Sequence, residues 1–251
     1  MSALDTALAG RLRELMARRP VLVAFDFDGV LAPIVDEPSA ARALPGTGDL
    51  LNALADLDGV HVALVSGRAL AALRAASEVP ADSRLLLVGS HGAEVDGVDL
   101  RLDTVAAQRL AEVVAAFQEL SADRPGVHVE TKPAGVVLHT RRADRALAAD
   151  VTQQALEVAD RPGCHVTRGK EVVEVSVVET GKGIALTRLR EQLGARAVLY
   201  AGDDATDENA FAVLGDADVG VKVGEGPTLA AWRLPDPESV QELLRGLVAA
   251  G

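Results

Sequence analysis

The sequence is poor in aromatic residues and contains a single cysteine. Aromatic residues make up 2% of the 251 residues, too few for the stacking platforms of proteins that bind single-stranded nucleic acid. Cys164 has no second cysteine with which to form an internal disulfide, which is typical of proteins from a reducing cytoplasm. Basic residues are also outnumbered, and the net charge of −12 argues against a nucleic-acid-binding surface.

Long hydrophobic runs are missing as well. Nothing approaches the roughly 18 consecutive apolar residues of a membrane span, and residues 1–20 lack the apolar stretch and cleavage site of a signal peptide. Leucines at positions 4, 8, 12 and 15 have the spacing of an amphipathic helix instead. We therefore expect a cytoplasmic, monomeric protein that acts on a small molecule and has no nucleic-acid or membrane partner.

Short apolar runs alternate with segments of helical periodicity along most of the chain. The expected strands are 21–25, 61–66, 85–89, 197–202 and 218–224. The expected helices between and after them are 47–57, 69–78, 181–194, 206–215 and 237–250. This alternation predicts an α/β fold with a doubly wound, Rossmann-like parallel sheet.

The middle of the chain departs from that alternation. Residues 126–142 have the pattern of an antiparallel hairpin with a Lys-Pro-Ala-Gly turn, and 164–177 that of a second hairpin turning at Arg168–Gly169. A helix is expected between them, over 142–160. We interpret residues 97–175 as a smaller α/β domain inserted into a core formed by 1–96 and 176–251.

Acidic side chains gather where the core strands end. Asp26 and Asp28 follow the first strand, and Asp203, Asp204 and Asp207 follow a later one. Carboxyl ends of parallel strands meet at one edge of a sheet, so these carboxylates would repel one another unless a cation lies between them. Mg²⁺ is the usual choice where phosphate is also bound. An acidic helix N-terminus is an equally good explanation of the later cluster taken alone.

Lysine is rare, with four residues against 21 arginines. Because the two side chains are not interchangeable, each lysine invites a functional explanation. Lys182 opens a predicted helix just before the second acidic strand, where its compact charge could reach a phosphate. A solvated lysine is the alternative there. Ser66, at another strand end, is either a phosphate contact or an ordinary helix N-cap.

The segments DFDGVL (26–31), SGR (66–68), GKG (181–183) and GDDATDE (202–208), in this order, resemble the four motifs of the haloacid dehalogenase superfamily of phosphohydrolases. Further segments resemble the trehalose-6-phosphate phosphatase family in particular. These segments are GSHGAEV (89–95), VETK (129–132), VVLHTRR (136–142), GKEVVEV (169–175) and AGDDATDENAF (201–211).

The resemblance implies roles for individual residues. Asp26 would be the nucleophile, Asp28 the general acid and base, and Lys182 a catalytic cation. Mg²⁺ would be held by Asp26, Asp28 and Asp203, with Asp204 and Asp207 in or around the metal site. The remaining contacts fall into two groups: phosphate-binding Ser66, Gly67, Arg68 and Lys182, and substrate-binding Glu130, Lys132, Arg141, Lys170, Glu174, His91 and Glu94.

On the predicted hairpins, Glu130 and Lys132 share a strand face, and so would Lys170 and Glu174. Solvated hairpin surfaces are the plainer alternative, and His139 is either a packed strand residue or a ligand. The expected activity is hydrolysis of trehalose 6-phosphate through an aspartyl-phosphate. The alternatives are a phosphatase for sucrose phosphate, mannosylglycerate phosphate or a pseudo-disaccharide phosphate, a mutase, and a non-catalytic phospho-sugar sensor.

Overall fold

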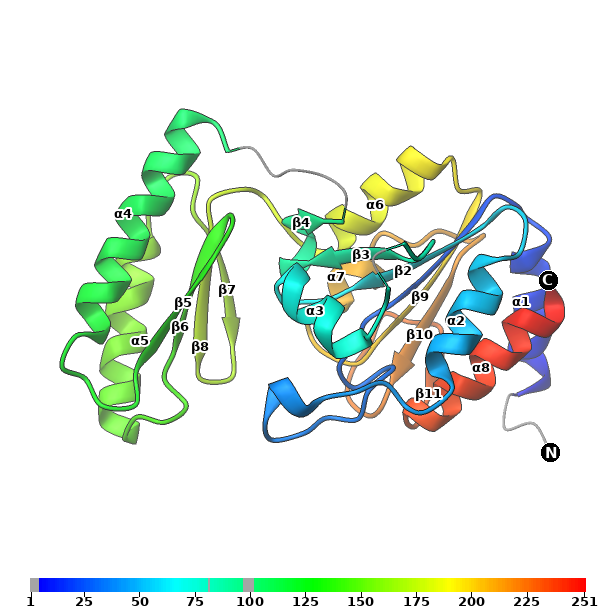
Figure 1. Cartoon of the computed structure of the whole chain (residues 1–251), viewed down its shortest axis with the longest axis horizontal. Helices are drawn as coiled ribbons and strands as arrows, with labels where there is room; N and C mark the ends of the chain where they lie inside the picture. Colours follow the sequence, from blue (N-terminus) through cyan, green and yellow to red (C-terminus); the bar gives the residue numbers. More distant parts are fainter. Residues whose placement is uncertain (1–4, 81, 97–101) are drawn as a thin grey trace. The chain divides into compact units, whose positions relative to one another are not determined.

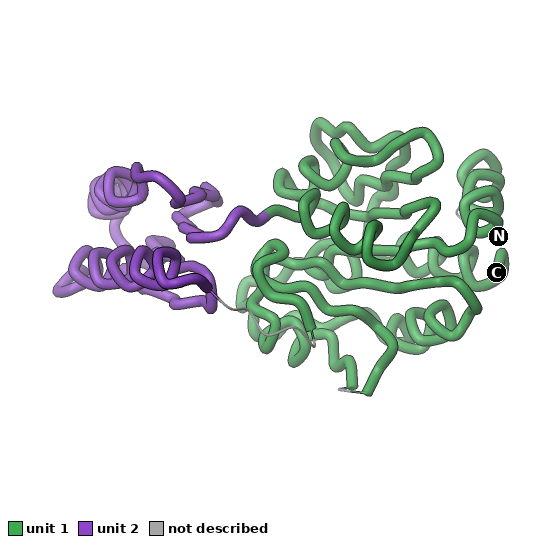
Figure 2. Tube along the Cα trace, turned by 90° about the horizontal axis from the view of Figure 1, so that it is seen from above, with its two compact units in different colours: residues 1–97, 181–251 green, residues 98–180 purple. Residues whose placement is uncertain are grey.

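The computed structural model describes residues 5–80, 82–96 and 102–251. The chain forms two compact units, one made of residues 1–97 and 181–251 and the other of residues 98–180 (Figure 2). The predicted insertion ended at residue 175, which is earlier than the second unit ends. The difference has a local cause, because Ser176 and Val177 both bond to the carbonyl of Ala134 in the second unit.

The first unit is built on a seven-stranded sheet with the order β11-β10-β9-β1-β2-β3-β4 (Figure 1). Its strands are β1 Val21–Phe25, β2 Val60–Val65, β3 Leu86–Gly89, β4 Glu94–Val95, β9 Ala197–Gly202, β10 Val219–Val223 and β11 Trp232–Leu234. All neighbouring pairs are parallel except β3 with β4. The central strand β1 is buried along its whole length, as its unbroken apolar run predicts.

Helices cover both faces of this sheet. They are α1 Thr6–Met16, α2 Thr47–Ala55, α3 Leu70–Ser77, α6 Lys182–Leu193, α7 Glu208–Phe211 and α8 Pro237–Ala250, with 3₁₀ turns at Pro38–Ala40 and Ser90–Gly92. Val21, Val23 and Phe25 of β1 pack with α1, α2, α3 and α8, whereas Leu22 and Ala24 pack with α6 and α7. The doubly wound parallel sheet is therefore confirmed.

The second unit is a four-stranded antiparallel sheet with two helices on one face. Its elements are α4 Thr104–Ser121, β5 His128–Lys132, β6 Gly135–His139, α5 Arg145–Ala159, β7 His165–Gly169 and β8 Val172–Ser176, with the strand order β5-β6-β8-β7. Val136, Leu138, Val173 and Val175 point toward Val113 and Phe117 of α4 and Val151 of α5, so this unit has its own apolar core.

Three expectations about these elements were wrong or incomplete. The helix expected over 206–215 is limited to α7, since Asp204 accepts the amides of Thr206 and Asp207 and holds a turn there. The second hairpin turns at Lys170–Glu171 and not at Arg168–Gly169, because Gly169 pairs with Val172. Helix α4 was not predicted. None of the described helices is long and apolar enough to cross a membrane.

Candidate active site

The site lies at the carboxyl end of β1, between β2 and β9. Asp26 follows β1 directly, and its amide donates to the carbonyl of Ala201, so the strand pairing continues up to the carboxylate. Asp26 is buried, and its Oδ1 accepts the Phe27 amide at 2.6 Å. The next residues close a tight loop in which the amides of Leu31 and Ala32 donate to the Phe27 carbonyl. This loop fixes where Asp28 emerges.

Lys182, the first residue of α6, joins two of the buried carboxylates. Its Nζ lies 2.7 Å from Asp26 Oδ2 and 2.7 Å from Asp207 Oδ1, with Asp204 farther away at 3.8 Å. Burial lowers the pKa of Lys182, but the charges of Asp26 and Asp207 raise it by more, so the ammonium stays charged. Lys182, the catalytic cation expected from the sequence, therefore lies among the carboxylates of Asp26, Asp204 and Asp207.

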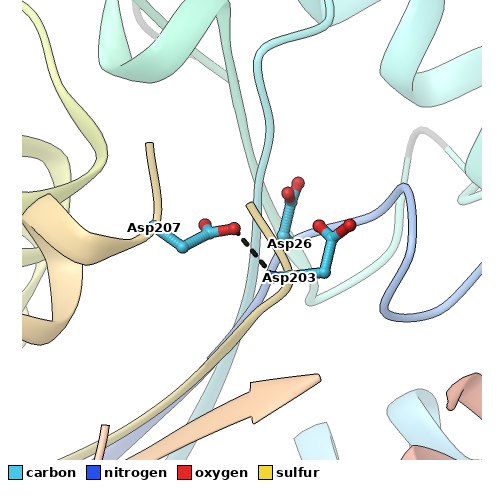
Figure 3. A group of neighbouring side chains, drawn as sticks. All are labelled: Asp26, Asp203 and Asp207. Atoms are coloured by element: carbon cyan, nitrogen blue, oxygen red, sulfur yellow. Dashed lines mark hydrogen bonds between the residues drawn. The ribbon is translucent and has the colours of Figure 1, made fainter. Parts of the chain in front are cut away.

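The acidic loop after β9 supplies the remaining carboxylates. Oxygen atoms of Asp26, Asp203 and Asp207 all lie within 4.8 Å of one another. Figure 3 shows Asp26 and Asp203 side by side, with a dashed line for the hydrogen bond from the Asp203 amide to Asp207. A divalent cation with oxygen ligands fits such a group of carboxylates.

Burial of so many acids in one place shifts their titration. It raises the pKa of Asp26 to about 8, with Lys182 opposing the rise and Asp207 adding to it. Burial and the charges of Asp207 and Asp204 raise the pKa of Asp203 to about 7. For Asp204, burial is outweighed by Lys182 and by hydrogen bonds from Thr206 and Asp207, which lower its pKa to about 2. The cluster has more negative charge than Lys182 balances.

Asp28 is paired with Arg68 rather than with the acidic cluster. Arg68 Nε and Nη2 donate to the two Asp28 oxygens at 2.6 and 2.7 Å, a bidentate pair. Arg68 belongs to the predicted phosphate-binding set, and Ser66 of that set is buried with its Oγ accepting the Arg68 amide. These residues come together at the ends of β1 and β2 as predicted from their sequence positions.

His91 and Glu94 lie on the short segment after β3, within the same unit. The backbone at His91 has a φ of 52°, and a side chain on Gly67 would approach the His91 ring to 2.6 Å. His91 therefore packs against the predicted phosphate-binding segment. Glu94 Oε1 accepts from the Leu70 amide and from Ser90 Oγ, which places it at the start of α3. Their roles as substrate contacts remain predictions.

The charged residues of the second unit form a separate group on the sheet face opposite the two helices. Glu130 of β5 is paired with Val137 of β6, which is in turn paired with Glu174 of β8, so the three residues form one row across the sheet. Lys132 Nζ donates to Glu174 Oε1 at 2.9 Å, and His139 Nε2 lies 2.9 Å from Glu130 Oε2. His139 thus stands beside Glu130 on this face rather than in the apolar core.

Two of the predicted substrate-binding residues in the second unit do not lie on strands. Lys170 is in the β7–β8 turn, so the expectation that it shares a strand face with Glu174 was wrong. Arg141 is exposed in the turn after β6. Both are still within the same unit as Glu130 and Glu174, and their substrate role remains a prediction.

Sequence reasoning gave no role to two buried residues of the site. Lys222 of β10 donates to the backbone carbonyl of Asp203, and Tyr200 of β9 donates to Asp207 Oδ1 at 2.5 Å. In both cases the only indication in the sequence was the rarity of the residue type, since the chain has four lysines and one tyrosine. Lys222 is one of the four lysines for which the sequence invited a functional explanation, but the strand pattern alone does not show which group it reaches.

Comparison with known proteins identifies the family. The family model described as trehalose-phosphatase matches residues 24–238. The trehalose-phosphate phosphatases of Mycobacterium bovis (strain BCG / Pasteur 1173P2) and Mycobacterium tuberculosis (strain ATCC 25618 / H37Rv) are each 35% identical to the chain over 260 residues, covering 96% of it and 65% of their own length. The chain thus spans about two thirds of these curated relatives.

Solved structures agree with this match. The C-terminal domain of C. albicans trehalose-6-phosphate phosphatase superposes with a TM-score of 0.77 at 25% identity, covering 98% of both chains. Trehalose-6-phosphate phosphatase of Aspergillus fumigatus gives a TM-score of 0.69 at 28% identity, covering 100% of both chains. With its paired aspartates, central lysine and acidic loop at one end of the sheet, the chain belongs to the trehalose-phosphatase family.

Proposed function

We propose that the protein is a Mg²⁺-dependent phosphatase that hydrolyses trehalose 6-phosphate to trehalose and phosphate. The observation that carries this proposal is the buried Asp26–Lys182 pair, with Asp28 two residues along the same loop, in a chain of this family. A phosphatase needs a nucleophile, a cation beside it and a second carboxylate for proton transfer, and all three occur here. A non-catalytic sensor would not need this set.

The residues present fit a divalent cation. Three carboxylates converge within 4.8 Å, and burial raises the pKa of Asp26 and Asp203, as expected for buried carboxylates with little compensating positive charge. Asp26, Asp203 and the backbone carbonyl of Asp28 would hold the ion, with Asp204 and Asp207 around it. Bound Mg²⁺ would neutralise charge on the phosphoryl oxygens, which otherwise repel an attacking carboxylate.

The side chains then divide the reaction between them. Asp26 attacks phosphorus in line and forms an aspartyl-phosphate, while Lys182 and Ser66 hold phosphoryl oxygens. Asp28 gives a proton to the departing sugar oxygen and later takes one from the water that hydrolyses the intermediate. Asp28 can do this only after Arg68 leaves its carboxylate oxygens, and the dianionic phosphate offers Arg68 another partner.

We assign selection of the sugar to the second unit. The sheet face opposite its helices carries a Lys132–Glu174 pair and a Glu130–His139 pair, and a polyhydroxylated ligand needs such strong donors and acceptors. Arg141 and Lys170, on neighbouring turns, would complete the set. A phosphatase for another disaccharide phosphate is the nearest alternative, but the family match and the 35% identical relatives favour trehalose 6-phosphate.

The test is phosphate release from trehalose 6-phosphate and from glucose 6-phosphate, which lacks the second sugar. Because a few hydrogen bonds to charged groups contribute about 1.5–3 kcal/mol each, we expect kcat/KM to be at least about a hundredfold lower for glucose 6-phosphate. Lys170→Ala and Glu174→Ala should impair only the disaccharide reaction and spare a small aryl phosphate, whereas Asp26→Asn should abolish both. Equal rates for the two sugar phosphates would contradict the proposed substrate.

A further inference from the structure

Tyr200 is the only tyrosine of the chain, and it is fully buried in β9 beside β1. Its ring packs edge-on against Phe211, with 5.7 Å between the ring centroids. A phenylalanine would fill the same space without the cost of burying a hydroxyl. The hydroxyl therefore needs an explanation, and the structure provides one in its 2.5 Å hydrogen bond to Asp207 Oδ1.

The Asp207 carboxylate is held from four directions. Oδ1 accepts from Tyr200 and from Lys182 Nζ, and Oδ2 accepts the amides of Asp203 and Asp204 at 2.9 and 3.0 Å. Each carboxylate oxygen has two acceptor positions, so these donors occupy all of them. Asp207 thereby ties the start of α6, the acidic loop and β9 into one rigid group.

Tyr200 differs from the other donors because it is a neutral side chain. Lys182 divides its ammonium between Asp26 and Asp207, at 2.7 Å from each. If the Tyr200 hydroxyl were absent, Oδ1 would keep Lys182 as its single donor and would attract it more strongly, at the expense of Asp26. The hydroxyl satisfies Oδ1 without adding a charge that would compete with Lys182.

We propose that Tyr200 is a positioning residue for the phosphatase reaction: its hydroxyl fixes Asp207, and Asp207 in turn holds Lys182 against Asp26 and the acidic loop in place for the metal. This inference rests on the function proposed above. Tyr200 contacts neither Asp26 nor the predicted phosphate-binding residues by hydrogen bond within the described residues, so it acts through Asp207.

The decisive variant is Tyr200→Phe, which removes the hydroxyl and keeps the ring contact with Phe211. A hydrogen bond to a charged group is lost, so we expect kcat on trehalose 6-phosphate to fall about tenfold to a hundredfold, with KM changed less than about twofold. Calorimetry on the substrate-free protein should show Mg²⁺ binding weakened by about fivefold, because Asp207, which accepts the loop amides of Asp203 and Asp204, is then held by one side-chain donor fewer.

Phe211→Leu is the matched control, since it disturbs the ring packing and keeps the hydroxyl. It should lower the melting temperature while leaving kcat and Mg²⁺ affinity within about twofold. Because Tyr200 is the only tyrosine, growth on 3-fluorotyrosine replaces it alone. That labelled protein retains a hydroxyl and should retain its turnover. If Tyr200→Phe lowers only the melting temperature, the positioning role is overturned.

A double-mutant cycle with Asp207→Asn tests the route of the effect. Once Asp207 is changed, adding Tyr200→Phe should reduce kcat by less than about twofold further. Independent, multiplicative losses would overturn the inference. Failure of the proposed function is distinguishable, because wild type would then not release phosphate from trehalose 6-phosphate, whereas the effect of Tyr200→Phe on Mg²⁺ binding would still be measurable without substrate.

Discussion

Gly29 sits where the loop after β1 comes closest to the acidic loop. Its φ of +74° belongs to the left-handed region, and a Cβ at this position would overlap the carboxylate of Asp203. The same residue thus satisfies two conditions, a tight turn after Asp28 and room for a predicted metal ligand. A side chain here would displace Asp203 before it affected any apolar packing.

We therefore expect Gly29→Ala to damage activity more than stability. The backbone strain should cost about 1–2 kcal/mol, and displacement of Asp203 should lower Mg²⁺ affinity and kcat by at least about tenfold. Gly46→Ala is the matched control, because Gly46 also has a positive φ, +84°, but open space around it. It should lose similar stability and keep full activity. Equal activity losses in both variants would contradict this account.

For individual residues, the sequence was informative where the expected reaction requires a particular type of side chain. Asp26, Lys182 and Asp203 were predicted from strand ends and motif order, and the structure brings them together. Tyr200 and Lys222 were not assigned, because a buried polar residue inside an apolar strand does not indicate which face it points to or which partner it meets. That information exists only once the strands are paired.

Helix α6 depends on a close approach to α7. Gly183, the second residue of α6, leaves no space for a Cβ, which would overlap the backbone carbonyl of Asn209. Gly10 in α1 is the opposite case, a helical glycine at which an added Cβ would meet nothing within 4 Å. Alanine favours a helix over glycine by about 0.5–1 kcal/mol. Replacing each of these two glycines by alanine therefore distinguishes the effect of helix propensity from the effect of packing.

We expect Gly10→Ala to raise the free energy of unfolding by about 0.5–1 kcal/mol and leave activity unchanged. Gly183→Ala should lower stability by about 1–3 kcal/mol through overpacking and reduce kcat, because α6 carries Lys182. Denaturant melts and phosphate-release rates check both. A stabilised, fully active Gly183→Ala protein would show that α6 can shift without moving Lys182.

Elements differ in how well the sequence predicted them. The parallel strands were found because fully buried strands give unbroken apolar runs. Helix α4 was missed although Asp103 caps it by accepting the Ala106 amide, since it lies between the predicted domain boundary and the first hairpin. The β7–β8 turn was misplaced because its left-handed residue is Glu171, with a φ of +61°, where a glycine was expected.

The stability of the whole molecule should depend on pH and Mg²⁺ together. The pKa values of Asp26 and Asp203 are raised to about 8 and about 7. Each therefore contributes stability that is fully present below the unfolded pKa, near 4, and is lost as pH rises through the folded value. Mg²⁺ would replace the departing protons, so its stabilising effect should grow over the same range.

We predict that the same fixed concentration of Mg²⁺ raises the melting temperature more at pH 8 than at pH 6, because the ion competes with fewer bound protons at pH 8. Binding at a hundred times the dissociation constant stabilises by about 2.7 kcal/mol, or roughly 5–11 °C for a protein of this size. Asp203→Asn should remove most of the difference between the two pH values. A Mg²⁺-induced shift that is the same at pH 6 and pH 8 would argue against a metal site at these carboxylates.

The smaller unit, residues 98–180, is inserted between the two parts of the larger unit, so it is synthesised before the larger unit is complete. Central strand β1 pairs on one side with β2 and on the other with β9, where Ala197 lies opposite Val21. All four strands of the smaller unit and its apolar core come from residues that precede β9 in the chain. We therefore expect that a nascent chain can complete this unit while one edge of β1 still lacks its neighbour β9, and such an unpaired apolar edge is prone to aggregation. The interval between the emergence of β1 and β9 from the ribosome is when we expect the chain to be most exposed to aggregation.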